Sequence, residues 1–143
     1  MSHPSDPSRP ALRVILAEAS ASVREGLRQA LAELPGVGVA AEASSRAELA
    51  TVLGTTPAEV LLLDVDLSQG DLTHCLAVCR RDRPGIRVVA LSELRSPALD
   101  LHCYAAGVDA VLSKTGRLET LAGTLARFAS QAPSVAAGPL PLL

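Results

Sequence analysis

The chain has 143 residues, of which 48% are hydrophobic, and a formal net charge of −2. This length suits one domain with a substantial apolar core, so a second folded domain is not expected. The near-neutral charge and a content of one Tyr, one Phe and no Trp argue against direct nucleic-acid binding, which uses a basic face or aromatic stacking platforms.

Short apolar runs recur along the chain at near-equal spacing and predict β-strands. They are LRVILA, VGVAA, EVLLLD, IRVVAL and DAVLSK, centred near Val14, Val39, Leu62, Val88 and Val111. Segments with helical periodicity follow each run. Strand and helix therefore alternate five times, which predicts an α/β fold: an open, mostly parallel, doubly wound sheet with helices on both faces.

Local signals indicate where the helices begin and end. The segments 22–25 (SVRE) and 45–48 (SRAE) have the spacing of a capping box. Ser96 and Pro97 are expected to begin the fourth helix, and Gly107 to end it. Apolar stripes are predicted on the first, third and fifth helices: Val23, Leu27, Ala30, Leu31 and Leu34; Leu72, Cys75, Leu76 and Cys79; Leu118, Leu121, Leu125 and Phe128.

The two ends of the chain differ in composition from the centre. Residues 1–11 and 131–143 are rich in Pro, Ser, Gly and Ala, and we predict flexible tails on either side of a domain at 12–130. The N-terminus lacks an apolar signal region, and no run approaches the length of a membrane span. We therefore expect a cytoplasmic protein.

The cysteine content supports the same location. Cys75, Cys79 and Cys103 are odd in number and lack paired spacing, which favours reduced thiols over a disulfide framework. Cys75 and Cys79 are four residues apart on an apolar stripe. This position favours buried thiols over a metal site.

Polar residues end four of the five predicted strands. They are Glu18, Asp64, Ser92 and Lys114. In parallel sheets, ligands bind outside the carboxyl ends of the strands, so these side chains should meet at one edge. A carboxylate can attack phosphorus, a second acid can hold Mg²⁺, and a hydroxyl and an ammonium can contact phosphoryl oxygens. The sequence therefore predicts a phosphoryl-transfer site with Asp64 as the nucleophile.

Four longer stretches indicate a family. RVILAEASASVREGLRQAL, PAEVLLLDVDLSQGD, RVVALSE and YAAGVDAVLSK, within about Leu12 to Ser130, resemble the receiver domain of bacterial two-component response regulators in order and spacing. The resemblance implies a flavodoxin-like five-stranded parallel sheet of order 2-1-3-4-5 with five flanking helices. It also implies phosphorylation of Asp64, phosphoryl contacts from Ser92 and Lys114, and Mg²⁺ bound by three residues. These are Glu18, Asp64 and Asp66, the last through its backbone carbonyl or its side chain.

The sequence departs from this family at two functional positions. The second acid after strand one, which is a direct metal ligand in the family, is replaced by Ala19. The aromatic residue three positions before the lysine is replaced by Val111. The first change removes a ligand, so Mg²⁺ binding should be weak. The second removes the ring that moves inward with Ser92 in the family, so phosphorylation at Asp64 is expected to be weak or absent and poorly transmitted.

Three functions are compatible with these observations. The first is a stand-alone receiver that a histidine kinase or phosphotransfer protein phosphorylates and that signals by binding a downstream protein, without direct contact to nucleic acid or membrane. It would not be an enzyme, except at most for self-dephosphorylation. The second is an atypical receiver that binds a partner or small ligand without phosphorylation, which Ala19 and Val111 favour. The third, remote function is a phosphatase, because LLLDVDLS resembles the nucleophile motif of haloacid-dehalogenase-like phosphatases. That family places the motif on its first strand, not its third.

Overall fold

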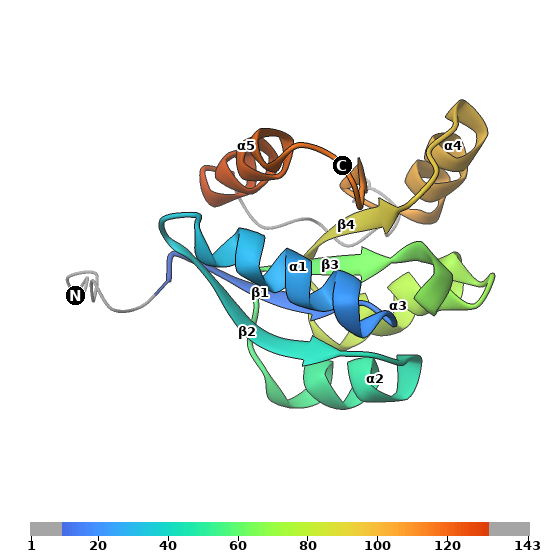
Figure 1. The fold of residues 1–143 in the computed structure, drawn as a ribbon. Helices are drawn as coiled ribbons and strands as arrows, with labels where there is room; N and C mark the ends of the chain where they lie inside the picture. Colours follow the sequence, from blue (N-terminus) through green and yellow to red (C-terminus); the bar gives the residue numbers. More distant parts are fainter. Residues whose placement is uncertain (1–9, 132–143) are drawn as a thin grey trace, which may run out of the picture.

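Each apolar run that predicts a strand forms one in the computed structural model, which describes residues 10–131 (Figure 1). A short 3-10 helix, η1, follows the third strand. In chain order the elements are β1 (Leu12–Ala17), α1 (Ala21–Ala32), β2 (Val37–Ala43), α2 (Arg46–Thr55), β3 (Val60–Asp64), η1 (Val65–Ser68), α3 (Leu72–Asp82), β4 (Arg87–Ser92), α4 (Pro97–Ala106), β5 (Ala110–Ser113) and α5 (Leu118–Ala129).

The strands form one parallel sheet in the order β2-β1-β3-β4-β5, which confirms the predicted fold class. The central strand β3 is buried along its whole length. Its sequence, VLLLD, does not alternate between apolar and polar residues, because helices cover both of its faces.

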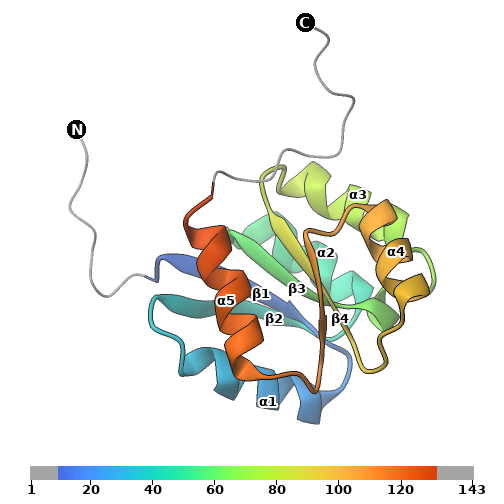
Figure 2. The same cartoon turned by 90° about the horizontal axis from the view of Figure 1, so that it is seen from above.

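The helices divide between the two faces of the sheet. Helices α1 and α5 pack on one face, and α2, α3 and α4 pack on the other (Figures 1 and 2). Each face has its own apolar core, because alternate residues of a strand point to opposite sides. Leu62 of β3 belongs to the core under α1 and α5, whereas its neighbours Leu61 and Leu63 belong to the other core.

The predicted capping box at 22–25 is wrong. Helix α1 begins two residues earlier, with Ser20 as its N-cap, and the Ser20 hydroxyl accepts a hydrogen bond from the Val23 N–H at 3.3 Å. Glu25 pairs with Arg28 on the helix surface instead. The Ser20 N–H, which a Glu at the third helical position would bind in a capping box, donates to the Glu18 carboxylate at 2.9 Å, and the third position is Val23.

The other predicted helix ends are confirmed, but the capping box at 45–48 is only half formed. Ser45 caps α2 by accepting the Glu48 N–H, whereas the Glu48 carboxylate accepts the N–H of Ser44. Ser96 caps α4 with Pro97 in its first turn. Gly107 ends α4 in the left-handed region, at φ = 111°. All four residues of the α3 stripe are buried, as are three of the four on α5.

The stripe predicted on α1 is only partly buried. Leu31 is the one residue of α1 that is fully buried, whereas Leu27 and Leu34 pack at the margin of the core. Val23, Leu27 and Ala30 instead line a cavity of about 420 Å³ that also reaches α5 and the end of β5. The stripe therefore faces α5 across an open groove.

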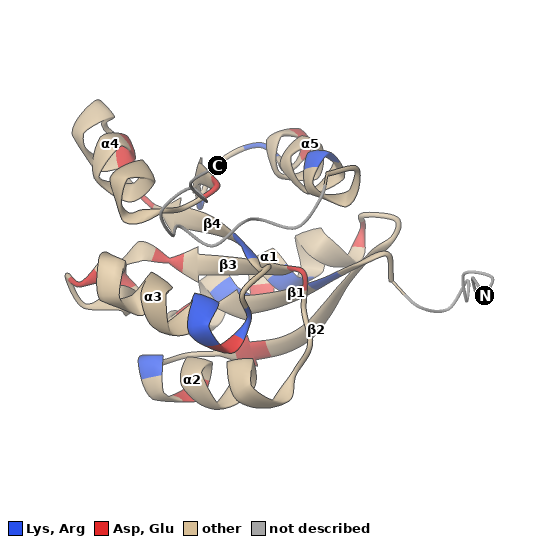
Figure 3. Cartoon of the chain, turned by 180° about the vertical axis from the view of Figure 1, so that it is seen from behind, with Lys and Arg blue, Asp and Glu red and all other residues tan. Residues whose placement is uncertain are grey.

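The cysteines, the absence of a membrane span, the distribution of charge and the tails are the remaining features predicted from the sequence. All three cysteines are free and buried, as predicted. None of the helices within residues 10–131 combines the length and the apolar character that a membrane span needs. The positions of acidic and basic residues are interspersed along the ribbon in Figure 3. The predicted tails, 1–11 and 131–143, fall almost entirely outside the described residues, so their flexibility and the domain limits 12–130 stay predictions.

Gly107 allows a direct test of local backbone geometry. A Cβ on Gly107 would lie 3.0 Å from Nη1 of Arg80, which is buried and ion-paired with Asp109 at 2.9 Å. Because φ is also positive here, Gly107→Ala should destabilise the protein by about 1–2 kcal/mol. Gly123, in the middle of α5 with open space around it, is the matched control. Gly123→Ala should stabilise the protein by about 0.5–1 kcal/mol in urea denaturation, because Ala favours helix. If Gly107→Ala and Gly123→Ala changed the free energy of unfolding equally, the left-handed conformation described for Gly107 would be contradicted.

Candidate functional site

The register of the sheet brings the predicted site residues to one edge. Ala17 is paired with Leu63, Asp64 with Leu91, and Ser92 with Ser113. The residues that follow or end these strands therefore lie next to one another at the carboxyl edge. Ligands bind at this edge in open α/β sheets.

Three of the predicted residues form a buried cluster at this edge. The Lys114 ammonium lies 2.8 Å from Oε1 of Glu18 and 2.9 Å from Oδ1 of Asp64. The Glu18, Asp64 and Lys114 side chains are 1%, 3% and 6% exposed. We call these three residues the carboxylate–lysine cluster. One buried cation thus neutralises part of the charge of two buried anions, which would otherwise be costly to desolvate.

Asp64 is held in position by backbone donors as well as by Lys114. Its Oδ1 accepts the Asp66 N–H at 3.0 Å, and its Oδ2 lies 3.5 Å from the Ala19 N–H. Burial raises the pKa of Asp64, but hydrogen bonds from the Lys114 ammonium and the Asp66 N–H outweigh burial, so that its pKa lies below the ordinary value. Asp64 is therefore ionised at neutral pH, which is the state a nucleophilic carboxylate requires.

The pKa of Lys114 is shifted upward, in the direction opposite to that of Asp64. Burial lowers the pKa of its ammonium, but hydrogen bonds to Glu18 and Asp64 outweigh burial, and the net pKa is raised. The β5 end that carries Lys114 is fixed by its own backbone, because the Lys114 N–H donates to the Ser92 carbonyl at 2.9 Å. Lys114 therefore remains charged between the two carboxylates.

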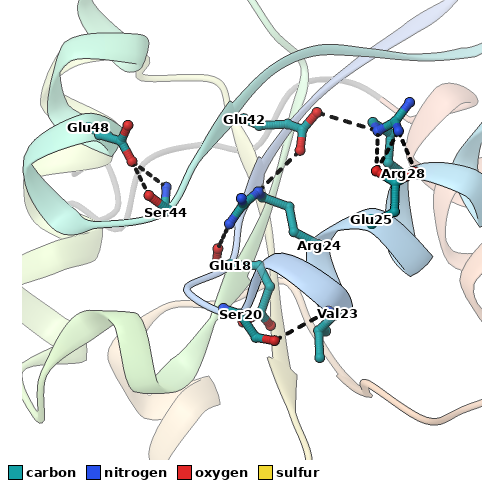
Figure 4. Close-up of polar contacts among 9 residues, drawn as sticks. All are labelled: Glu18, Ser20, Val23, Arg24, Glu25, Arg28, Glu42, Ser44 and Glu48. Carbon is teal, nitrogen blue, oxygen red and sulfur yellow. Dashed lines mark hydrogen bonds and ion pairs between the residues drawn. The ribbon is translucent and has the colours of Figure 1, made fainter.

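Arg24 of α1 fixes the loop that carries Glu18, and sequence reasoning missed it. Its Nη1 donates to the Glu18 carbonyl at 2.8 Å, and its Nε lies 3.3 Å from the Glu42 carboxylate of β2 (Figure 4). Arg28 also reaches Glu42, at 3.8 Å. A cation in the first turn of a helix is unfavourable to the helix dipole, so the position of Arg24 was the one available signal that it has a tertiary partner.

Ser92 and Asp66 lie at the same edge but do not contact the cluster with their side-chain oxygens. The Ser92 hydroxyl donates to the Leu94 carbonyl at 2.8 Å. The Asp66 side chain is exposed, and its carbonyl accepts the Gln69 N–H at 3.1 Å. The phosphoryl contact assigned to Ser92 and the metal role assigned to Asp66 therefore stay predictions.

The residues at the site do not fit a dedicated Mg²⁺ centre. Within residues 10–131, no group of three or more His, Cys, Asp or Glu side chains could hold a metal ion. The position of the family's second acid is taken by the exposed Ala19, which offers no side-chain oxygen. An ion bound by both Glu18 and Asp64 would also have to compete with the ammonium of Lys114 for Oε1 and Oδ1.

The core on the Val111 side of β5 contains no aromatic ring among the described residues. Val111 is buried and belongs to the core shared with α2, α3 and α4. Tyr104, on α4, is 50% exposed. It therefore behaves as an ordinary surface residue and does not replace the aromatic side chain that the family has at position 111.

The fold and the cluster together define a flavodoxin-like α/β domain with an ionised aspartate and a lysine at the carboxyl edge of its sheet. Residues 14–126 match the family model of the response regulator receiver domain. Because this match covers most of the chain, the protein belongs to the receiver domain family of two-component signalling. No curated protein is similar enough in sequence to count as a match.

Solved structures show the same fold. A LuxR-family two-component response regulator from Aurantimonas sp. SI85-9A1 has a TM-score of 0.75 at 20% identity, over 88% of this chain and 90% of that one. The non-phosphorylated receiver domain of RcsB from Escherichia coli has a TM-score of 0.76 at 22% identity, over 85% and 95%. RcsB from Salmonella typhimurium, described for its DNA interaction, has a TM-score of 0.76 at 22% identity, over 88% of this chain and 62% of that one.

Proposed function

We propose that this protein is an atypical, cytoplasmic receiver that signals by binding a downstream protein and in which phosphorylation of Asp64 is weak or absent. The carboxylate–lysine cluster carries this proposal. In it, Lys114 already contacts both Glu18 and Asp64, while Ala19 supplies no metal ligand. The Lys114 ammonium thus neutralises part of the charge of both carboxylates, while the side-chain oxygen that would hold a divalent ion beside them is missing at position 19.

The chemistry of phosphorylation remains possible at this site, although slow. Asp64 is ionised and could attack phosphorus from a histidine kinase, a phosphotransfer protein or a small phosphodonor. Lys114 could then contact the phosphoryl oxygens, provided that it left one of its two carboxylates. Stand-alone action and the identity of the donor are parts of the same proposal.

A protein partner would find an apolar surface on and beside α4. Leu94 is 84% exposed, Leu101 is 72% exposed and Tyr104 is 50% exposed, and they are the large apolar residues most exposed within 10–131. Their exposure does not depend on Asp64, since these side chains already point to solvent. We therefore propose that this surface binds its partner whether or not Asp64 is modified.

The test compares spectra with and without beryllofluoride, a phosphoryl mimic. We expect backbone amide shifts in nuclear magnetic resonance to change only near Asp64 and Lys114, and little along α4, because Val111 provides no moving ring and a ligand shifts an equilibrium only through differential contacts. Asp64→Asn, which removes the acceptor charge, is the control. A large shift across α4 that Asp64→Asn abolishes would show an ordinary phosphorylation switch and overturn the proposal.

The haloacid-dehalogenase-like phosphatase gains no support from the site. Asp66, which would have to act as its general acid, is exposed, and it bonds to Asp64 through its backbone N–H and not through its carboxylate. Receiver domains are signalling domains in general, and their known aspartate chemistry modifies the protein itself. Turnover of a phosphomonoester by this protein, lost in Asp66→Asn, would revive the phosphatase.

A further inference from the structure

A second cluster of reactive side chains lies between α2 and α3, away from the carboxylate–lysine cluster. A cavity of about 120 Å³ opens there. Its α3 wall includes Cys75 and Cys79, and its α2 wall includes Arg46. The two cysteines are one helical turn apart on the same face of α3, and both thiols are buried. The cavity gives a small reagent a route to them.

The two thiols differ in their acidity. Hydrogen bonding from the Cys79 thiol is the main reason that the pKa of Cys75 is lowered to about 7, and the positive charge of Arg46 lowers this pKa further. Burial and the negative charge of Asp71 act in the opposite direction and raise it. The same hydrogen bond, together with burial, raises the pKa of Cys79 well above its ordinary value. At neutral pH the pair therefore holds one substantially ionised sulfur beside one protonated thiol. An attacking and a resolving cysteine have these two states.

We propose that Cys75 and Cys79 form a redox-modification site at which a small hydroperoxide produces an intrahelical disulfide. The inference is independent of the proposed function, because it uses no residue of the carboxylate–lysine cluster. It assigns to the α2–α3 face an oxidative input that does not pass through Asp64.

The reaction balances with hydrogen peroxide as the oxidant. The Cys75 thiolate attacks one peroxide oxygen, so that an S–O bond forms, the O–O bond breaks, and the departing hydroxide takes up a proton to become water. The Cys79 sulfur then attacks the sulfenic sulfur of Cys75. The S–S bond forms, the S–O bond breaks, and the second hydroxide leaves as water with the Cys79 proton. Two thiols lose two electrons, and one peroxide becomes two waters.

The bridge requires this turn of α3 to distort. Four residues of α-helix rise about 6 Å, which lies within the range of about 4.4–6.8 Å between the Cα atoms of disulfide-bonded residues. Their Cβ atoms, however, are about 5–6 Å apart in a regular helix, whereas a disulfide needs about 3.5–4.5 Å. The bridge would draw both sulfurs together and strain this turn of α3. That turn packs on α2 through Leu49 and Leu53, which also line the cavity. Oxidation should therefore loosen the contact between α2 and α3.

The sequence allows a direct assay by peptide mapping. Trypsin places Cys75 and Cys79 together in peptide 47–80, which contains no internal Lys or Arg, and places Cys103 alone in peptide 96–114. After exposure of the whole protein to hydrogen peroxide and alkylation of the remaining thiols, we expect peptide 47–80 to be lighter by two hydrogens and unalkylated. Treatment with dithiothreitol should reverse the change.

Cys103 is the internal control. It is also buried, but it has no neighbouring thiol, and burial raises its pKa. Cys75 should react with peroxide about tenfold faster than Cys103, because its thiolate fraction is larger while its nucleophilicity is somewhat lower. Cys79→Ser should stop the reaction at a one-oxygen adduct on Cys75 that dimedone captures. Equal rates at Cys75 and Cys103, or oxidation of peptide 47–80 without an internal bridge, would overturn the proposal. The wild-type protein alone gives this answer even if the variant does not fold.

Discussion

Replacing Lys114 with Met lowers the free energy of unfolding at pH 7 by an expected 3–5 kcal/mol, roughly the cost of removing one partner from a buried ion pair. Glu18 and Asp64 would remain buried without the cation that now lies 2.8 and 2.9 Å from them. Urea denaturation followed by circular dichroism measures the loss. Arg117→Met is the matched control, because Arg117 is exposed and its side chain makes no capping bond at the start of α5. Its effect should stay within about 0.5 kcal/mol.

The pH dependence gives a second signature of the same cluster. The pKa of Asp64 is lowered on folding, so its ion pair stabilises the protein above the unfolded value of 3.8 and is lost as pH falls through the folded value. The pKa of Lys114 is raised, so its contribution is present below 10.5 and is lost as pH rises through the folded value. The deficit of Lys114→Met should therefore shrink in acid, as the carboxylates take up protons. A deficit that is the same at pH 7 and in acid would contradict the role given to Lys114.

Combining Lys114→Met with Asp64→Asn separates the effect of charge on stability from the effect of packing. In the double variant the site loses one buried anion together with the cation, so the penalty should be smaller than that of Lys114→Met alone. If the two single effects simply add, the Lys114–Asp64 contact is not energetically coupled, and the cluster would be a geometric coincidence.

The fold was predictable because its determinants are local and repeated. Runs such as LRVILA and EVLLLD are short and largely apolar, which favours buried strands, and the periodic segments between them can cover a sheet on either face. Parallel strands then bring their carboxyl ends to one edge of the sheet, independently of the conformation of the loops. The gathering of Glu18, Asp64 and Lys114 follows from this rule alone.

The details that sequence reasoning missed depend on choices between equivalent local partners and on tertiary contacts. Ser20 and Ser22 are equally suitable N-caps by residue type, and it is Ser20 that caps α1, with its own N–H bonded to the Glu18 carboxylate two residues earlier. By sequence alone Arg24 is expected to be a solvated helix residue, whereas in the structure it lies beside Glu42 of β2. The Ser92 hydroxyl donates to the Leu94 carbonyl, a bond that depends on the path of the loop between β4 and α4.

The largest gain of function should come from Ala19→Asp. Ala19 lies directly after Glu18, and its N–H is 3.5 Å from Oδ2 of Asp64, so a carboxylate there would face the same edge. Mg²⁺ takes oxygen ligands and usually one or two carboxylates from the protein, so an added carboxylate should tighten binding about tenfold or more, an improvement of at least about 1.4 kcal/mol. Isothermal titration of both proteins with Mg²⁺ measures the difference. Ala21→Asp is the control for added charge, because Ala21 is also exposed but lies within the first turn of α1.

The same variant should also accept a phosphoryl group more readily. In the natural protein the two carboxylates share Lys114, which leaves the cluster one net negative charge to attract a divalent ion. A third carboxylate raises this to two net negative charges, so Ala19→Asp incubated with acetyl phosphate and Mg²⁺ should gain one phosphoryl group, seen by intact mass, faster than the natural protein. The gain should disappear in Ala19→Asp combined with Asp64→Asn. If the natural protein binds Mg²⁺ as tightly as Ala19→Asp and is phosphorylated as fast, then Lys114 does not limit metal access, and the site works as an ordinary receiver despite Ala19.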